Sequence, residues 1–392
     1  MVTNINIPQG YKQTELGIIP EDWEVVLLGS GLRFQTGYPF QSSYFNGDGM
    51  GVRLIRNRDL KSDDSITHYS GAIYNEFIVN NYDILIGMDG DFMPCVWDKG
   101  VALLNQRVGR LVVKNDWSPR FLYYALQEPL KQKEQGTGAT TVKHLSHSDI
   151  ERILMSIPPS KEQRAIAEAL SDVDGLIAAL DKKIAKKRLL KQGAMQQLLT
   201  GKKRLPDFTD VWVEKKVKDV FRVTRGYVLA TNKVMEQPDG YHKYPVFSSQ
   251  TQNNGVMGYY SNYLFENAIT WTTDGANAGE VNYRQGKFYC TNVCGVLMSD
   301  DGYANECIAS IINMVAKSHV SYIGNPKLMN NVMADIEICI PPSIKEQQAI
   351  ATILSDMDKE IADLEAQRDK YRLLKSGMMQ KLLTGQIRLK TE

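Results

Sequence analysis

The sequence predicts an α+β fold: two mixed α/β domains joined by two long antiparallel coiled-coil helices, in a tandem repeat with pseudo-two-fold symmetry. Residues 161–205 return as residues 345–389, and 27 of the 45 aligned positions are identical, which indicates a duplication. Apolar residues recur in both copies at alternating steps of four and three, the spacing of a coiled-coil seam. The segments that precede the two copies have the length and composition of ordinary globular domains.

Each copy is expected to be one helix of about 39 residues, roughly 58 Å long at 1.5 Å per residue. The helices should begin after the proline pairs at 158–159 and 341–342, because Ser160 with Gln163 and Ser343 with Glu346 have the spacing of a capping box. They should end at Gly201 and Gly385, where glycine allows a left-handed cap. The predicted seam residues are Ile166, Leu170, Val173, Ile177, Leu180 and Ile184, and in the second copy Ile350, Leu354, Met357, Ile361 and Leu364.

Two features of the helices go beyond their length. Arg368 stands where the first copy has Ile184, so the helices have become unlike partners, which favours pairing within one chain. Gly193 and Gly377 lie inside the helices at a cost of roughly 1 kcal/mol each relative to alanine. They suggest a bend or a close backbone approach, with chance as the alternative.

The domain boundaries follow from the repeat. We place the first domain at residues 1–156, the first long helix at 157–206, the second domain at 207–339, and the second helix and tail at 340–392. Runs rich in β-branched and aromatic residues predict strands in both domains, at Ile78–Ile86, Val101–Val113, Tyr244–Phe247 and Lys287–Met298. Faint parallels suggest one shared fold: Trp23 with Trp212, Asp89-Gly90 with Asp274-Gly275, and Lys143 and Leu145 with Lys327-Leu328.

Composition excludes several classes of protein. No stretch has the 18 apolar residues that a membrane helix needs, and the first residues lack a signal-peptide pattern, so we expect a cytoplasmic protein. Five cysteines without framework spacing argue against a disulfide scaffold. Cys290, Cys294 and the scattered histidines do not have zinc spacing. Neither an Asn-Pro-Pro-aromatic signature nor a phosphate-binding glycine loop occurs, so no catalytic, cofactor or metal site is predicted in this chain.

Charge is distributed unevenly along the chain. Lysines and arginines minus acidic residues give −3 for each of the two domains, +6 for residues 157–206 and +1 for the remainder. The basic run lies on the first helix, where a solvated helix face is the ordinary explanation.

The repeat also suggests a use. If the ends of each domain lie close together, the first helix leads to the second domain and the second helix returns, so the helices are antiparallel. Such a molecule would hold a small domain at either end of a spacer. Since B-DNA rises about 3.4 Å per base pair, a spacer of about 58 Å could hold two short reading heads on one duplex with an unread gap between them.

Several motifs are specific when they are taken together. Both helix starts read Pro-Pro followed by Glu-Gln, Ala-Ile-Ala and Leu-Ser-Asp, at 158–172 and 341–356, and both helices end in Leu-Leu-Thr-Gly. The segment Ile19-Pro20-Glu21-Asp22-Trp23 completes the set. The doubled set is far more specific than a single capping box. With these features the chain resembles the specificity subunits of type I restriction-modification systems over nearly its whole length.

The resemblance implies two target recognition domains that read the two halves of a bipartite DNA sequence, and helices that set the gap. It further implies two methyltransferase subunits docked on the helices, with restriction subunits joining the complex. In that family the partners carry adenine methylation that uses S-adenosylmethionine, and translocation and cleavage that use ATP and Mg.

The residues that contact DNA are predicted from side-chain chemistry. Arginine pairs with guanine through two hydrogen bonds, and asparagine or glutamine does the same with adenine. In the first domain the candidates are Tyr38, Gln41, Ser42, Ser43, Arg53, Arg56, Asn57, Arg58, Asn105, Gln106 and Arg107. For the arginines, salt bridges to Asp59, Asp63 and Asp64 are an equally good explanation.

In the second domain the candidates are Ser248, Ser249, Gln250, Thr251, Gln252, Asn253 and Asn254. Asn254-Gly255 is also a hairpin-turn signal. Lys143 and Lys327 fall at matching places and suit phosphate contacts, although isolated lysines can equally be inert.

Other functions are open. The acidic balance of each domain also suits a coiled-coil adaptor that binds proteins, and alanine at Arg56 and Arg58 would separate the two readings by its effect on half-site preference. A nuclease is poorly supported, because Asp-Gly turns account for the acidic residues of Met88-Asp89-Gly90-Asp91. If partner subunits supply most of the positive surface, the isolated chain should bind DNA weakly.

Overall fold

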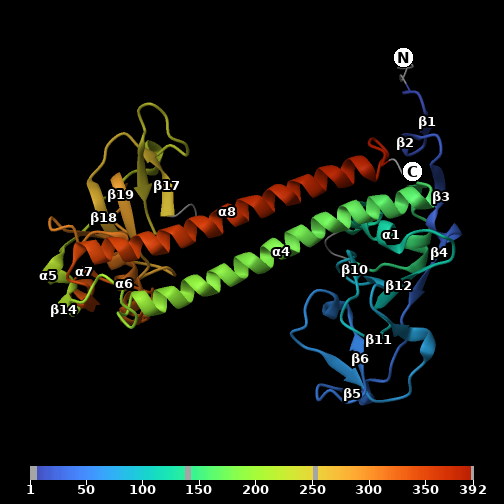
Figure 1. Cartoon of the computed structure of the whole chain (residues 1–392), viewed down its shortest axis with the longest axis horizontal. Helices are drawn as coiled ribbons and strands as arrows, with labels where there is room; N and C mark the ends of the chain where they lie inside the picture. Colours follow the sequence, from blue (N-terminus) through green and yellow to red (C-terminus); the bar gives the residue numbers. More distant parts are fainter. Residues whose placement is uncertain (1–6, 137–142, 250–254, 390–392) are drawn as a thin grey trace. The chain divides into compact units, whose positions relative to one another are not determined.

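The computed structural model describes residues 7–136, 143–249 and 255–389. Within it the chain forms two compact units, one of residues 1–180 with 367–392 and one of residues 181–366. The division cuts both long helices, so each unit contains one predicted domain, the start of one helix and the end of the other (Figure 1).

The first unit is built from short strands. A four-stranded sheet has the order β10-β9-β12-β4 and a five-stranded sheet the order β5-β7-β6-β11-β8. The elements are β1 (Tyr11–Thr14), β2 (Gly17–Pro20), β3 (Glu24–Leu27), β4 (Leu32–Thr36), β5 (Phe45–Asn46), β6 (Val52–Ile55), β7 (Thr67–Tyr69), β8 (Ile78–Val79), β9 (Ile84–Gly87), β10 (Pro94–Val96), β11 (Ala102–Leu104), β12 (Val108–Val113), α1 (Pro119–Ala125), α2 (Gln127–Gly136), α3 (His147–Glu151) and β13 (Leu154–Ile157).

The second unit is organised around one six-stranded sheet with the order β15-β20-β18-β19-β16-β17. The elements are β14 (Val213–Lys216), α5 (Val217–Val220), β15 (Arg222–Arg225), β16 (Tyr244–Phe247), β17 (Val256–Tyr260), β18 (Phe265–Thr272), β19 (Val281–Cys290), β20 (Cys294–Met298), α6 (Glu306–Ala316), α7 (Asn330–Asp335) and β21 (Glu337–Ile340). Both units also pair a strand that begins the domain with the strand that ends it, β3 with β13 and β14 with β21.

Each main core includes residues from both long helices. In the first unit, Trp23 and Phe121 pack with Ile166 of the first helix and Leu382 of the second. In the second unit, Trp271 and Ile308 form one core with Leu198 and Leu199 near the end of the first helix and Ile350 near the start of the second. The helices are therefore part of the domains that they join.

The predicted strands are present, but three of the four runs are divided. Tyr244–Phe247 coincides with β16, whereas Ile78–Ile86 holds β8 and β9, Val101–Val113 holds β11 and β12, and Lys287–Met298 spans the end of β19 and all of β20. The divisions are tight turns: Val108 N–H donates to the Asn105 carbonyl at 2.9 Å and Cys294 N–H to the Thr291 carbonyl at 3.1 Å. The strands on either side of these turns do not pair with each other: β8 and β11 belong to the five-stranded sheet and β9 and β12 to the four-stranded sheet, whereas β19 and β20 each pair with β18.

The two long helices confirm the predicted length. Helix α4 runs from Ser160 to Leu198 and α8 from Ile344 to Leu382, 39 residues each. Both end as predicted, since Gly201 and Gly385 have φ of 68° and 71°, in the left-handed region that favours glycine. Seam residues such as Ile166, Leu170 and Ile350 are buried.

Within the second unit the helices run antiparallel. Lys187 contacts Glu360 at 2.7 Å, and Lys191 contacts Asp358 at 2.5 Å, so positions rise along α4 as they fall along α8. Gly193 and Gly377 do not meet the prediction of a close backbone approach. A Cβ added at either glycine would meet no heavy atom within 4 Å in the described part of the chain.

The capping-box prediction is wrong, because the residues proposed to form the boxes bond elsewhere. The Ser160 hydroxyl donates to the Asp116 carbonyl, and the Gln163 amide accepts from Ser118 N–H at 2.8 Å and donates to the Pro158 carbonyl at 2.8 Å. Glu346, the proposed box partner of Ser343, accepts from Arg204.

The helix starts instead hold a buried carboxylate. In the first unit, Glu162 accepts two hydrogen bonds of 2.7 Å from Arg388 and one of 3.0 Å from the Trp23 indole. Arg388 also donates to both oxygens of Asp22. The hydrogen bonds with Glu162 and Asp22 raise the pKa of Arg388, and the hydrogen bond from Arg388 lowers the pKa of Asp22.

The second unit repeats this cluster. Glu346 accepts from Arg204 at 2.8 and 2.9 Å and from the Trp212 indole at 3.3 Å. Glu162 and Glu346 are only 3% and 1% exposed, so each depends on its arginine to offset the loss of water. Trp23 and Trp212, paired from the sequence, thus have the same partner in their units.

Arg388→Ala and Arg204→Ala should each lower the free energy of unfolding of their unit by about 3 kcal/mol, because each leaves a buried carboxylate unpaired. Hydrogen exchange of amides in the affected core measures the change unit by unit. Arg222→Ala is the control, since Arg222 is exposed and donates only to the Met298 sulfur among the bonds described for it. An equal loss of unfolding free energy in all three variants would show that pairing with the buried carboxylates does not account for the effect.

Candidate nucleic-acid interface

Two parallel strand pairs bring the main candidate residues together. In the first unit β11 runs parallel to β6, with Leu104 opposite Ile55. In the second unit β16 runs parallel to β19, with Phe247 opposite Cys290. Parallel strands end at the same edge of a sheet, so residues 56–58 lie beside 105–107, and residues 248–249 lie beside 291–293.

The Asp-Gly loop of the first unit continues this edge. Met88 N–H donates to the Arg107 carbonyl at 3.0 Å, Gly90 N–H to the Lys143 carbonyl at 3.1 Å, and Leu145 N–H to the Met88 carbonyl at 2.8 Å. Backbone bonds thus fix three loops in a line, residues 105–107, 88–90 and 143–145. We call this line, with its counterpart in the second unit, the loop row.

The second unit builds the same loop row. Thr273 N–H donates to the Val293 carbonyl at 3.0 Å, Gly275 N–H to the Pro326 carbonyl at 2.9 Å, and Leu328 N–H to the Thr273 carbonyl at 2.9 Å. Its loops are residues 291–293, 273–275 and 326–328. The predicted parallel between the two Asp-Gly turns is confirmed in their bonding.

The loop row corrects one predicted correspondence. The backbone of Asp89 forms an isolated β-bridge with that of His144, and the backbone of Asp274 does the same with Lys327. The next residues, Leu145 and Leu328, are both fully buried. His144 is therefore the counterpart of Lys327, and Lys143 is the counterpart of Pro326. The proposed match of Lys143 with Lys327 is wrong by one residue, because the register depends on the buried leucine.

A glycine lies beneath the first loop of each row. A Cβ at Gly37 would lie 2.2 Å from the Asn105 carbonyl oxygen, and one at Gly226 would lie 2.1 Å from that of Cys290. The tyrosine that follows donates its N–H across the same contact, Tyr38 to Leu104 at 2.9 Å and Tyr227 to Cys290 at 3.0 Å. Gly-Tyr is the sequence signal that could have located the turn in the second domain.

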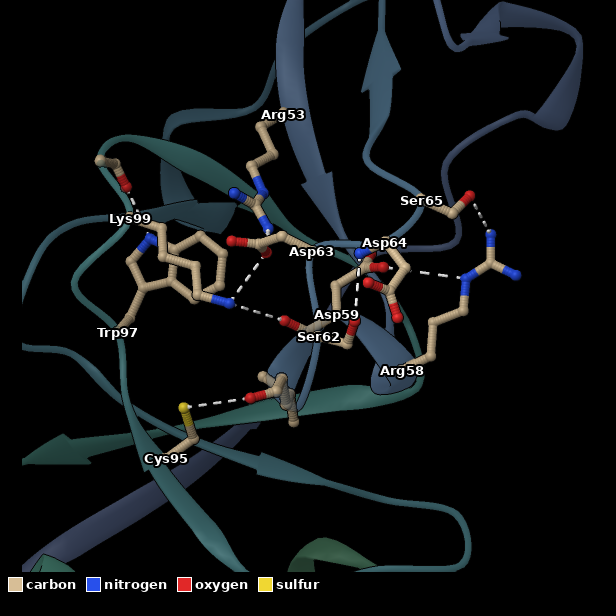
Figure 2. A network of polar contacts seen from close by, with 12 residues as sticks. Arg53, Arg58, Asp59, Ser62, Asp63, Asp64, Ser65, Cys95, Trp97 and Lys99 are labelled. Carbon is tan, nitrogen blue, oxygen red and sulfur yellow. Dashed lines mark hydrogen bonds and ion pairs between the residues drawn. The ribbon is translucent and has the colours of Figure 1, made fainter. Parts of the chain in front are cut away.

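Two arginine candidates of the first unit, Arg53 and Arg58, pair with nearby carboxylates (Figure 2). Arg53 pairs with Asp63 and lies over the Trp97 ring, 4.9 Å from its centroid. Hydrogen bonds from Lys99 and then Arg53 lower the pKa of Asp63. Because Arg53 is committed to these contacts, it is the arginine least able to reach a base.

Arg56 and Arg58 both pair with the buried Asp59, at 3.3 and 3.8 Å. Arg56 also donates to the Ser65 carbonyl at 2.8 Å, whereas Arg58 donates to the Ser65 hydroxyl at 3.3 Å and keeps 60% of its side chain exposed. The alternative explanation, salt bridges from the arginines, is therefore confirmed for Asp59 and Asp63. Arg58 nevertheless keeps most of its side chain exposed.

Three further polar residues of the first unit surround Asp89. The Asn57 amide donates to the Asp89 carbonyl at 2.6 Å, Arg107 lies 3.5 Å from its carboxylate, and the His144 ring lies at 2.9 Å. Arg107 is 55% exposed. Lys143 pairs with Glu134 at 3.5 Å.

The remaining candidates of the first unit lie on the segment that follows Gly37. Tyr38 packs against Tyr74 and Phe77, with ring centroids 4.7 and 5.3 Å apart. Gln41, Ser42 and Ser43 are exposed. Asn105 and Gln106 form the turn of the loop row, with Gln106 exposed and its N–H bonded to the Tyr38 carbonyl at 3.1 Å.

In the second unit, Lys327 lies 3.9 Å from Asp274, and the Thr273 hydroxyl donates to the Asp274 carboxylate at 2.7 Å. Ser248 accepts from the Thr291 hydroxyl at 3.1 Å and the Ser249 carbonyl accepts from the Asn277 amide at 3.4 Å. Gln250, Thr251, Gln252, Asn253 and Asn254 lie outside the described residues.

The sequence prediction missed several residues that share this edge. Asn292 occupies the turn that corresponds to Gln106, and Arg225 donates to the Asn292 carbonyl at 2.5 Å. Tyr227, the counterpart of Tyr38, is 64% exposed. Asn277 and His144 complete the set. The Gly-Tyr pair could have located Tyr227, whereas propensity gives no signal for the others, because their position follows from strand pairing.

No helix in residues 7–136, 143–249 and 255–389 combines the length and apolar character needed to cross a membrane. Among those same residues, no cluster of three or more histidine, cysteine or acidic side chains is arranged to hold a metal ion.

Comparison with known proteins places this duplicated arrangement in a family. The family described as the type I restriction modification DNA specificity domain matches twice, at residues 20–187 and 209–371. The chain belongs to this family. The two matches correspond to the two predicted domains with their helices, so the duplication read from the sequence is a duplication of the family's domain.

Relatives agree with the family match. The type I restriction enzyme EcoBI specificity subunit of Escherichia coli is 36% identical over 51% of this chain and 43% of its own length. The MjaVIII specificity subunit of Methanocaldococcus jannaschii is 25% identical over 95% of this chain and 94% of its own. The match therefore spans less than half of the first relative and nearly all of the second.

The fold is also found in a solved structure. The type I restriction-modification S subunit from M. genitalium has a TM-score of 0.67 and 15% identity, over 97% of this chain and 98% of that one. At that identity the likeness supports the fold alone.

Gly226→Ala should disturb the loop row of the second unit, because the added methyl group meets the Cys290 carbonyl at 2.1 Å. We expect hydrogen exchange at the Tyr227 amide to speed up at least tenfold, with about 1–3 kcal/mol lost from overpacking. Gly37→Ala should act likewise at Tyr38. Gly47→Ala is the control, since nothing lies within 4 Å of a Cβ there. Unchanged exchange in the first two variants would show that the close contact at these glycines does not hold the loop row.

Proposed function

We propose that this chain is the DNA sequence-specificity subunit of a type I restriction-modification complex, and that each domain reads one half of a bipartite, asymmetric target. The observation that carries the proposal is the loop row, which is built twice on the same backbone bonds but presents different side chains. Backbone held rigid by hydrogen bonds, with variable polar side chains on it, is what base readout needs.

The side chains at matching positions differ in ways that matter for bases. At matching positions the first unit has Gln106, Arg107 and His144 where the second has Asn292, Val293 and Lys327, and it has Arg56-Asn57 where the second has Ser248-Ser249. Arginine, asparagine and glutamine make two-bond contacts with particular bases, whereas lysine and histidine also suit phosphates. Two unlike sets predict two unlike half-sites, hence an asymmetric target.

The helices have the role of a spacer in this proposal. Their 39 residues would fix the unread gap between the half-sites, as a pair of antiparallel coiled-coil helices related by pseudo-two-fold symmetry. This arrangement follows from the family and from the antiparallel course of α4 and α8 inside the second unit.

The helices also offer two equivalent places for a partner. Leu189 and Leu190 are 69% and 50% exposed, and their counterparts Leu373 and Leu374 are 76% and 51% exposed. Each pair lies one turn before a glycine with open space above it, Gly193 or Gly377. Exposed leucines repeated in both copies suit two copies of one partner, and we assign them to two methyltransferase subunits, through which restriction subunits join.

In this assembly the chain itself carries out no chemical step. Adenine methylation, which requires S-adenosylmethionine, and cleavage, which requires ATP and Mg, belong to the partner subunits. The protein acts in the cytoplasm, where it meets double-stranded DNA.

Sequencing that detects methylated adenine tests the function. In a host free of DNA methylation, co-expression of this chain with its methyltransferase subunit should produce a new motif of two short blocks separated by a fixed gap. A host that lacks this chain is the control. Assembly of the two proteins without any new motif would exclude sequence readout and leave the adaptor role.

Arg58→Ala and Arg107→Ala should relax the preference at positions of one block and leave the other block unchanged. Each arginine contact with a guanine contributes about 1–3 kcal/mol of discrimination, so the affected positions should accept other bases about tenfold more often. Arg33→Ala, an exposed residue on β4 of the same domain, is the matched control. Changes in both blocks, or in neither, would contradict the assignment of one domain to one half-site.

Leu189→Ser with Leu190→Ser, and separately Leu373→Ser with Leu374→Ser, should each remove one of two bound methyltransferase subunits. The combination should remove both. Leu176→Ser is the control. Leu176 is 48% exposed on the same helix, but the second copy has Glu360 at the aligned position, so this leucine is not repeated. Native mass spectrometry of the co-purified complex counts the subunits, and a constant two-to-one ratio in every variant would exclude these leucines.

A further inference from the structure

The loop row of the second unit ends in a closed hairpin. Ser321 N–H donates to the Lys327 carbonyl at 2.9 Å, and Lys327 N–H donates to the Ser321 carbonyl at 3.0 Å. Gly324 turns the chain with φ of 76°. The base of the hairpin is tied to the Asp-Gly loop, because Gly275 N–H bonds to Pro326 and Lys327 lies 3.9 Å from Asp274.

The tip of this hairpin is apolar and almost entirely solvent-exposed. Ile323 is 94% exposed and Tyr322 is 70% exposed. Ile323 is the most exposed large apolar side chain in the described part of the chain. Single exposed apolar residues are common, but a pair held at the tip of a tied hairpin, beside the proposed reading loops, is not explained by packing.

The charge around the tip favours a polyanion as its partner. Lys317 and His319 precede the hairpin, and Lys327 closes it. Asp274 lies 3.9 Å from Lys327. Basic residues on both flanks would hold two phosphates while the apolar tip meets the bases between them.

We propose that Tyr322 and Ile323 form a wedge that enters a base step of duplex DNA within the half-site read by the second domain. Tyrosine stacks on an unstacked base and isoleucine fills the opened step, as apolar side chains do in proteins that kink DNA. The proposal rests on the proposed function, and it adds to hydrogen-bond readout a dependence on how easily the step unstacks.

The wedge has a matched control in the same domain. Tyr241 is 70% exposed, as Tyr322 is, and it precedes β16, at the sheet edge opposite the loop row. Val211 is 84% exposed and lies before β14. The double variant Tyr241→Ser with Val211→Ser therefore removes a similar apolar surface away from the proposed contact.

The experiment uses the full chain in complex with its methyltransferase subunit, on duplexes of the motif found by methylation sequencing. 2-Aminopurine, whose fluorescence rises on unstacking, replaces an adenine at successive positions of the second half-site. The parental complex should raise the fluorescence several-fold at one step. Tyr322→Ser with Ile323→Ser should abolish the rise and weaken binding about tenfold, the loss of one base-stacking contact, while the control variant keeps both.

Each alternative outcome is distinguishable. A fluorescence rise and an affinity that persist in the double variant overturn the wedge but leave the proposed function intact. If the double variant loses the methyltransferase subunit but otherwise retains its DNA affinity, the tip contacts that subunit and not DNA. This outcome would also overturn the wedge. If the parental complex produces no split methylation motif, the proposed function itself is contradicted.

Discussion

The structure depends on the buried carboxylate at the start of each long helix. Glu162 and Glu346 lie where the chain leaves one domain, and each is held by an arginine that follows the end of the other helix, Arg388 or Arg204. The contacts span 226 and 142 residues of sequence. Replacing a buried ion pair by apolar residues can be neutral or stabilising, so the pair is best understood as fixing which helix end meets which helix start.

This constraint explains why a duplicated chain gives two complete units. The tail after α8 completes the first unit, where Arg388 also reaches Asp22 and where Gly385 accepts from the Tyr11 hydroxyl at 2.9 Å. The segment after α4 does the same in the second unit through Arg204 and Trp212. Each domain thus closes on helix residues from both copies, so the long helices and the domains fold as one problem.

The sequence predicted what depends on periodicity and repetition, and failed where tertiary pairing decides. Helix length and the left-handed glycine ends follow from local pattern, and the structure confirms them. Ser160 and Gln163 have the spacing of a capping box, yet the proline pair and Ser118 compete successfully for the Gln163 amide. The match of Lys143 with Lys327 failed because the register is set by Leu145 and Leu328, whose burial no local rule reveals. Asn292 was missed because only the strand pairing shows that it occupies the turn matching Gln106.

Under the proposed function, the ion pairs at the loop row would reconcile net acidic domains with sequence readout. Arg58 and Arg107 are both exposed by more than half but are paired with Asp59 and Asp89. Such an arginine gains little from a phosphate, since it gives up a carboxylate to reach one, so nonspecific affinity stays low. A guanine that offers two aligned acceptors can compete with the carboxylate, whereas a wrong base offers no such compensation. Under the proposed function, the acidic partners would lower affinity for all DNA while they widen the difference between right and wrong sequences, and the rest of the complex would supply the affinity.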